Sequence, residues 1–226
     1  RDQPRSRGLG DVYKRQVNKM LFPGIRILSV VLLLFASYQA IAQSLPSVEK
    51  MVAERILGDK NAPVEVIEYA SLTCPHCAAF HNGPWPKLKK EYVDTGKIKL
   101  IYRDFPTDQL ALAASMVAKC APENRYFSII KLMFRTQDKW RRSKNPREAL
   151  SNIGRLAGMS PATVEACMEN QAVFDGVMKQ RDEGHKNFNI EATPTLIVNG
   201  KKIEGGLTLE EFRAEFDKAH REAGKK

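Results

Sequence analysis

Two cysteines separated by two residues, Cys74 and Cys77, are the residues of this 226-residue chain whose spacing most directly suggests chemistry. Such a pair either forms a reversible disulfide or supplies two thiolate ligands to a zinc ion. Zinc usually takes four ligands, often from two such pairs, and the remaining cysteines, Cys120 and Cys167, do not form a second pair. Histidines can complete such a site, and the chain offers His81 and His185. The spacing alone therefore leaves a redox site and a metal site open.

The segment before the motif favours redox chemistry. Val64–Ala70 is rich in β-branched residues and almost continuously apolar, which predicts a buried central strand that passes into a helix at the motif. Unpaired backbone N–H groups and the helix dipole stabilise an anion at such a point. We therefore expect Cys74 to be the exposed nucleophile with a lowered pKa, and Cys77 to be the buried resolving thiol. Between them lie Pro75 and His76, whose imidazole adds a donor or a charge that stabilises the thiolate and strengthens the oxidant.

A proline directly before a predicted strand is the second unusual feature. Pro194, preceded by Thr193, stands before the strand predicted at Thr195–Val198, although proline cannot donate to a sheet ladder. A cis peptide bond there would turn the chain sharply and leave backbone groups facing the CxxC motif. Only ~5–6% of X–Pro bonds in folded proteins are cis, so the expectation of a cis bond rests on this position.

The predicted elements describe a mixed α/β chain. Helical periodicity over Cys77–Tyr92 is interrupted at Gly83-Pro84 and Pro86, where we expect a kink or a break. Strands are predicted at Val64–Ala70, Lys97–Phe105, Thr195–Val198 and Lys201–Glu204, the last two joined by a turn at Asn199-Gly200. Helices are predicted at Leu110–Lys119, Tyr126–Phe134, Arg147–Ala157, Pro161–Met168 and Val173–Asn187, and a last helix begins with a Thr208–Glu211 capping box. The stretch between Asp108 and Gly176 holds no strand candidate, which indicates an inserted helical subdomain.

Residues 1–42 are expected to be absent from the mature protein. Residues 1–16 resemble one reading frame of a sequencing adapter, which we interpret as an artefact, with a natural basic tail as the alternative. Residues 17–42 have the pattern of a signal peptide, since Lys19 and Arg26 are followed by an apolar run and a small-x-small site that ends at Ala42. The run is about half of the ~20 apolar residues that a membrane anchor needs. We therefore expect cleavage after Ala42 and no membrane span in the mature chain.

The charge balance changes once residues 1–42 are set aside. They hold seven of the 36 Lys and Arg residues and two of the 26 Asp and Glu residues, so the formal net charge falls from +10 to +5. A mild excess spread along helical segments indicates solvated helix faces rather than nucleic-acid binding. All four cysteines remain, and an even number in an exported chain indicates disulfides and an oxidising compartment, here the bacterial periplasm.

Taken together, the motifs resemble a known family. CPHC after the VEVIEYASLT strand, a helical stretch, and ATPTLIVNG before a hairpin are similar to the DsbA-like disulfide oxidoreductases, above all the branch common in alphaproteobacteria. The resemblance covers about residues 52–216. It implies a thioredoxin-like α/β fold from residues 43–107 and 177–226, with an inserted all-helical subdomain at residues 108–176. It also implies an enzyme that donates its Cys74–Cys77 disulfide to reduced, unfolded exported proteins, is reoxidised by a membrane quinone-linked partner, and uses no other cofactor and no metal.

The same resemblance suggests roles for residues outside the motif. Glu68 stands where the family carries a buried acid beneath the CxxC motif, with a raised pKa that would let it take the proton from Cys77. The alternative is an exposed glutamate at a strand edge, a description that Glu65 also fits. The family favours a cis bond before Pro194. Thr193 replaces a bulkier residue of part of the family, and its hydroxyl would hydrogen-bond the active-site sulfur and moderate the oxidising power.

Cys120 and Cys167 both lie in predicted helices of the insert. We expect them to form a structural disulfide, because neither has CxxC spacing or a polar neighbour that would activate a thiolate. A second redox relay is the alternative. In the chain-entropy model a disulfide across such a loop stabilises the fold by ~3–5 kcal/mol.

Three functions compete at this point. The first is a periplasmic oxidase acting through Cys74 and Cys77. The second is an isomerase or reductase at the same site, which usually requires a dimerisation domain that the short Gln43–Asn61 segment cannot supply, so we expect a monomer. The third is a non-catalytic metal-binding or chaperone-like surface protein. The redox potential of the Cys74–Cys77 pair separates the three.

Overall fold

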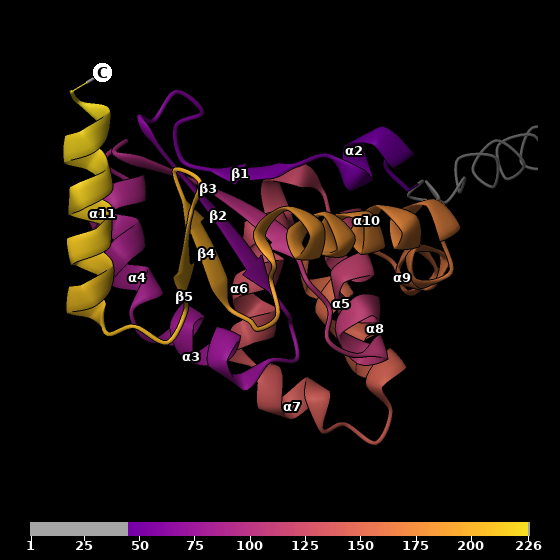
Figure 1. Cartoon of the computed structure of the whole chain (residues 1–226). Helices are drawn as coiled ribbons and strands as arrows, with labels where there is room; N and C mark the ends of the chain where they lie inside the picture. Colours follow the sequence, from indigo (N-terminus) through magenta and orange to yellow (C-terminus); the bar gives the residue numbers. More distant parts are fainter. Residues whose placement is uncertain (1–44, 226) are drawn as a thin grey trace, which may run out of the picture. The chain divides into compact units, whose positions relative to one another are not determined.

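The computed structural model describes residues 45–225 of the chain, and Figure 1 shows their elements along the sequence. The segment interpreted as an artefact, residues 1–16, and the predicted signal peptide, residues 17–42, lie outside the described residues, as does the predicted cleavage site after Ala42. Within residues 45–225, every helix is too short or too polar to cross a membrane.

A five-stranded mixed sheet forms the centre of the described chain. Its order is β1-β3-β2-β4-β5, with β2 and β3 parallel and the other neighbours antiparallel. The strands are β1 (Arg55–Leu57), β2 (Val64–Ala70), β3 (Ile98–Asp104), β4 (Thr195–Val198) and β5 (Lys201–Glu204). The predicted buried central strand is β2, and six of its seven residues are buried.

Helices surround the sheet and account for the rest of the regular structure. They are α2 (Val48–Val52), α3 (Pro75–Asn82), α4 (Trp85–Leu88), α5 (Gln109–Cys120), α6 (Tyr126–Arg135), α7 (Gln137–Arg141), α8 (Pro146–Leu156), α9 (Pro161–Met168), α10 (Gln171–Phe188) and α11 (Leu209–Ala223). A π-helical turn (Lys89–Val93) follows α4, and a 3-10 turn (Glu123–Arg125) precedes α6. The predicted α/β architecture, with helices alone between β3 and β4, is confirmed for the described residues.

Different helices cover the two faces of the sheet. Because side chains alternate along a strand, Val64, Val66 and Glu68 share one face of β2, while Ile67 and Tyr69 share the other. The first face packs in one hydrophobic cluster with α3, α4 and α11, and the second packs against the end of α10. In Figure 1, α4 and α11 lie to the left of the sheet and α10 to its right. Glu68 therefore lies on the face that carries the helix of the CxxC motif.

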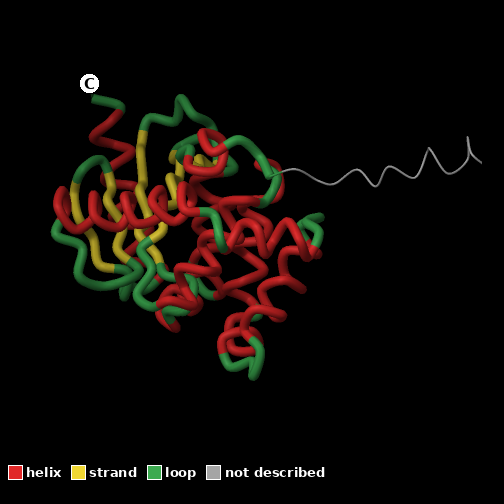
Figure 2. Tube along the Cα trace, turned by 90° about the vertical axis from the view of Figure 1, so that its right-hand side faces the viewer, coloured by secondary structure: helices red, strands yellow, loops and turns green. Residues whose placement is uncertain are grey.

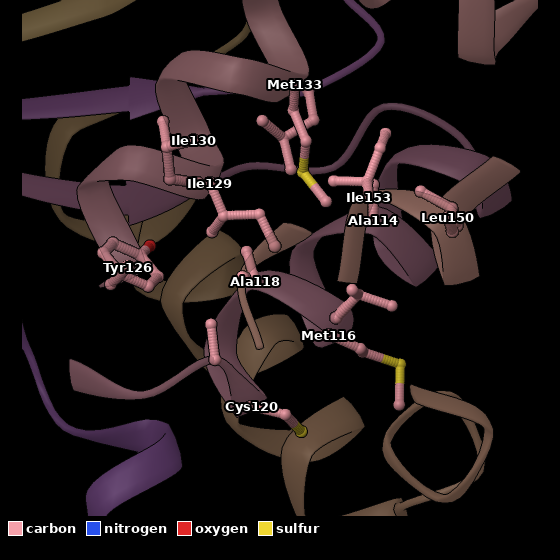
Figure 3. Packing of buried hydrophobic residues seen from close by; sticks show 14 of the residues in the cluster. Ala114, Met116, Ala118, Cys120, Tyr126, Ile129, Ile130, Met133, Leu150 and Ile153 are labelled. Carbon is pink, nitrogen blue, oxygen red and sulfur yellow. The ribbon is translucent and has the colours of Figure 1, made fainter. Parts of the chain in front are cut away.

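The helices α5 to α9 share a hydrophobic core with α10 and with residues of β2 and β3. Figure 3 shows its side chains, among them Ile129 and Met133 of α6 and Leu150 of α8, packed between the helices. The same cluster includes Cys77, so this core extends up to the helix of the motif. Figure 2 shows that helices make up one side of the described chain while the strands gather on the other.

Polar N-caps fix where the longer helices begin. The first N–H groups of a helix have no partner within it, and an N-cap oxygen supplies one. In five helices the N-cap side chain accepts a hydrogen bond from the N–H group three residues later; these caps are Asp108, Asn145, Ser160, Asn170 and Thr208. The predicted Thr208–Glu211 capping box is confirmed.

The structure also differs from the sequence-based prediction in a few places. The helix predicted over residues 77–92 is divided into α3, α4 and the π-helical turn, with the expected break at Gly83-Pro84. The short elements β1, α2 and α7 were not predicted, because three to five residues carry too little periodicity to be recognised. The predicted subdomain boundary after Gly176 lies inside α10, which runs unbroken through it.

Candidate active site

The CxxC motif lies at the point where β2 passes into α3. Cys74 is the N-cap of α3 and Pro75 is its first residue, a position at which the missing N–H group of proline costs nothing. The three-residue turn before it is held by hydroxyl contacts, in which the Thr73 hydroxyl donates to Asp108 over 2.6 Å. Gln137 of α7 donates from Nε2 to two carbonyls of the same segment, that of Leu72 over 2.8 Å and that of Cys74 over 3.0 Å.

Cys74 has the properties of a reactive thiolate. Its side chain is half-buried. Neither Cys74 nor its buried neighbour Cys77 forms a disulfide. A hydrogen bond from the Cys77 thiol is the largest of the effects that lower the pKa of Cys74 to about 5, while burial opposes it. The Thr193 side chain and the backbone N–H groups of Cys77 and His76 lower the pKa of Cys74 further. The expected depression of the Cys74 pKa is therefore present in the geometry.

Cys77 has the opposite character. Its side chain is fully buried one turn into α3. Burial raises the pKa of the Cys77 thiol far above its usual range, and the charges of Cys74 and Glu68 raise it further. Cys77 therefore holds its proton until another group removes it.

His76 acts in a different way from the one expected. Its side chain, like that of Pro75, is exposed at the start of α3. The contribution of His76 to the pKa of Cys74 comes from its backbone N–H group rather than from the imidazole. This follows from its position as the second residue of α3, where the N–H group has no partner within the helix.

The Thr193–Pro194 segment faces Cys74. Its peptide bond is cis, as expected, and the Cys74 thiol donates to the Thr193 carbonyl oxygen over 3.2 Å. The Thr193 side chain lowers the pKa of Cys74, and a lower pKa by itself favours the reduced pair. The moderating effect expected from Thr193 therefore stays a prediction.

Gly205, the residue just after β5, supports this segment and was assigned no such role from the sequence. Its N–H group donates to the Pro194 carbonyl oxygen over 2.9 Å. A Cβ atom at position 205 would lie 2.4 Å from that oxygen, so only glycine allows the approach. The Gly205-Gly206 pair just after a predicted strand is the signal that could have indicated it.

Glu68 is the buried acid beneath the motif. It is 0% exposed, whereas Glu65, which points to the other face of β2, is partly exposed and lies 3.3 Å from the Lys99 ammonium. The reading of Glu68 as an exposed strand-edge residue is therefore wrong. Its Oε1 atom lies 2.8 Å from Nε2 of His81, on the last turn of α3.

The remaining predicted residues take structural places. Cys120 and Cys167 form the predicted disulfide, which joins the end of α5 to α9. Among residues 45–225 no cluster of three or more metal-ligating side chains occurs, and His81, considered as a zinc ligand, is paired with Glu68 instead. His185 is exposed on α10.

Comparison with known proteins agrees with this geometry. The family model described as thioredoxin matches residues 50–218. A predicted protein-disulfide oxidoreductase of Rickettsia bellii is 33% identical over 76% of this chain and 67% of its own length. A Rickettsia typhi relative of the same description is 35% identical over 67% of this chain and 56% of its own length, so the chain spans little more than half to two thirds of these relatives.

A solved structure gives the same result. The crystal structure of Wolbachia pipientis alpha-DsbA1 superposes with a TM-score of 0.70 at 31% identity, over 75% of this chain and 92% of that one. The residues that the family model matches, 50–218, span β2, the CxxC helix, the helices between β3 and β4, and the Thr193–Pro194 segment. The chain therefore belongs to the thioredoxin family and, within it, to the DsbA-like thiol:disulfide oxidoreductases.

Proposed function

We propose that this protein is an oxidase that introduces disulfides into reduced, unfolded exported proteins. The observation that carries the proposal is the contrast within the motif, in which the pKa of Cys74 is lowered to about 5 and that of Cys77 is raised. A stabilised Cys74 thiolate stabilises the reduced pair relative to the disulfide, so the disulfide gives up its oxidising equivalents readily.

The reaction begins from the Cys74–Cys77 disulfide. A substrate thiolate attacks Sγ of Cys74, the bond between the two active-site sulfurs breaks, and Cys77 leaves and takes up a proton. The second substrate thiolate then attacks the substrate sulfur of the mixed disulfide. Cys74 leaves as the stabilised thiolate, and two electrons have moved from the substrate to the active-site pair. The half-buried Cys74 is the sulfur that substrates reach, since Cys77 is fully buried.

Glu68 serves Cys77 in both directions of this exchange. It lies beneath the motif on the face of β2 that α3 covers, and its charge is one of the causes that raise the pKa of Cys77. A buried carboxyl group so placed can give a proton to the leaving Cys77 and take it back when Cys77 attacks again.

The compartment and the partners follow from the chemistry. Each cycle leaves the pair with two electrons, so a second protein must remove them, and we propose a membrane quinone-linked partner in the periplasm, reached after signal cleavage at Ala42. The Cys120–Cys167 disulfide supports an oxidising compartment, because such bonds are rare in reducing ones. The cis-proline segment facing Cys74 supports a site for an extended substrate peptide.

The redox potential of the Cys74–Cys77 pair tests the proposal directly. We expect a potential above about −180 mV, together with rapid oxidation of a reduced, unfolded test protein. A potential near about −270 mV, typical of a reductase, would overturn the oxidase role and leave the exchange chemistry intact. The same measurement on the chain from residue 43 onward checks that the mature part is sufficient.

A further inference from the structure

The proposed reaction requires a proton to enter and leave a sealed site. Cys77 gains a proton when it leaves and loses one when it attacks, yet both Cys77 and Glu68 are 0% exposed. A carboxyl group that serves repeated cycles must exchange its own proton with solvent. The structure therefore needs a route from Glu68 to water that does not pass through the two sulfurs.

His81 is the titratable group in contact with Glu68. Its Nε2 atom lies 2.8 Å from Oε1 of Glu68, and its side chain is 7% exposed. The imidazole stacks on the ring of Phe134 with 4.1 Å between the centroids and 15° between the planes, which fixes its orientation. The second oxygen of Glu68, Oε2, is buried without a hydrogen-bond partner among the described residues. It is thus free to exchange a proton with Cys77, directly or through a water molecule.

His81 also borders a hollow of about 690 Å³ that lies between α4 with its π-helical turn and α6. Tyr102 also borders this hollow, and its hydroxyl is buried without a partner in the described part of the chain. The charged groups around the hollow are Lys89, Lys90, Asp94, Glu123 and Lys131. A space of this size, bordered by charged side chains as well as apolar ones, has room for water molecules, each of which takes about 30 Å³.

A second buried carboxylate on the same face of the sheet shows what is special about Glu68. Asp104 of β3 is paired with Lys119 of α5 over 3.4 Å, and both side chains are 1% exposed. Neither of them borders the hollow. Asp104 has a lysine amine as its partner, whereas Glu68 has an imidazole that can accept a proton on one nitrogen and release one from the other.

We propose that His81 carries the proton between Glu68 and the water of this hollow, an inference that rests on the proposed function. During reoxidation the Cys77 thiol gives its proton to the Glu68 carboxylate. The Cys77 thiolate attacks Sγ of Cys74 in the mixed disulfide, the active-site disulfide forms, and the partner leaves as a thiolate. Nε2 of His81 takes the proton from Glu68, and Nδ1 releases one to the hollow. Substrate oxidation runs the same transfers in reverse.

His81 touches neither sulfur, so it is a positioning residue that acts through Glu68. Glu68 from β2 and Tyr102 from β3 lie next to the imidazole. The charged groups around the hollow come from three segments: Lys89, Lys90 and Asp94 in and just after the π-helical turn, Glu123 in the 3-10 turn, and Lys131 in α6.

The test separates the two thiol steps in the full chain. The reduced protein is mixed with a coloured aromatic disulfide in a stopped-flow instrument. In the first phase the Cys74 thiolate attacks and releases one aromatic thiolate. In the second phase Cys77 attacks Cys74 and releases the other. The first phase and the redox potential report on the proposed function, and only the second phase reports on His81.

Two variants and a control decide the outcome. In His81→Gln, which keeps a donor for Glu68, we expect the second phase to slow at least about tenfold near pH 7 and to rise steeply with pH, with the first phase unchanged. In His81→Ala, free imidazole should enter through the hollow and restore the second phase. His185→Gln, on an exposed part of α10, is the matched control and should leave both phases unchanged.

Two results would contradict the role of His81. A second phase in folded His81→Gln within about twofold of the unmodified protein, or no rescue of folded His81→Ala by imidazole, would overturn the role of His81 while leaving the oxidase proposal intact. If neither variant folds, the solvent isotope effect on the second phase of the unmodified protein decides. A second phase about two times slower in deuterium oxide supports the relay, and an unchanged one rejects it.

Discussion

The two cysteine pairs of this protein consist of the same residue type but differ in redox state and in surroundings. Cys74 and Cys77 are free and lie at the N-terminus of α3, where backbone N–H groups reach the half-buried sulfur of Cys74. Cys120 and Cys167 are joined as a disulfide between α5 and α9, and both are fully buried in a hydrophobic cluster. The comparison teaches that reactivity comes from access and from the groups that stabilise the thiolate, since the residue type is the same in both pairs.

The largest effect should come from removing the nucleophile. Cys74→Ser should abolish oxidation of a reduced test protein, because among the described cysteines the other free thiol, Cys77, is fully buried. Cys77→Ser should instead accumulate a mixed disulfide between Cys74 and the substrate, visible by non-reducing electrophoresis. Residual activity in Cys74→Ser that disappears when Cys120 and Cys167 are also replaced would show that the buried pair is reactive as well.

Removing the buried pair should change stability and leave the chemistry intact. The disulfide closes a loop with a sequence separation of 47 residues, which corresponds to about 4 kcal/mol in the chain-entropy model. We expect Cys120→Ala/Cys167→Ala to lose about that much free energy of unfolding in urea. The redox potential of the Cys74–Cys77 pair should stay the same. A large shift of that potential would show that the buried pair is a redox relay.

The reactive pair should depend on its buried acid, and the structure supplies a matched control on the same strand. Glu68→Gln keeps the size of the side chain and removes the proton acceptor, so we expect the attack of Cys77 on Cys74 to slow by about a hundredfold. Glu65→Gln, on the opposite and partly exposed face of β2, should have little effect. Equal effects of the two changes would contradict a specific role for Glu68.

The reactive pair alone should also make the stability of the protein depend on pH. The pKa of Cys74 is lowered to about 5 in the folded protein, so its thiolate stabilises the reduced fold fully above the unfolded pKa of about 8.5. That stabilisation should decline as the pH falls and be lost below about 5. Thermal unfolding of the reduced protein between pH 9 and 4, compared with Cys74→Ser, measures it. An identical pH dependence in both proteins would show that the Cys74 pKa is not lowered.

Local patterns were enough to predict most of the fold. The bounds of β2 and β4, the break at Gly83-Pro84 and the Thr208–Glu211 capping box were all readable, because each depends on residues a few positions apart. The short strand β1 could not be predicted from the sequence, because a three-residue edge strand is defined by its pairing with β3 rather than by its own residues. The same reasoning applies to α7, which matters because Gln137 on it holds the segment before the motif.

The site divides in the same way. The position of Cys74 and Cys77 at a strand-to-helix junction, and of a proline before β4, could be predicted from the amino-acid sequence, because hydrophobic pattern and motif spacing are local properties. The contact of His81 with Glu68 and the packing of Gly205 on Pro194 were found only in the folded structure, as was the use of the Thr193 carbonyl oxygen as the acceptor for Cys74. These contacts join segments that different elements bring together, and a linear pattern carries no information on which side chains meet once those elements pack.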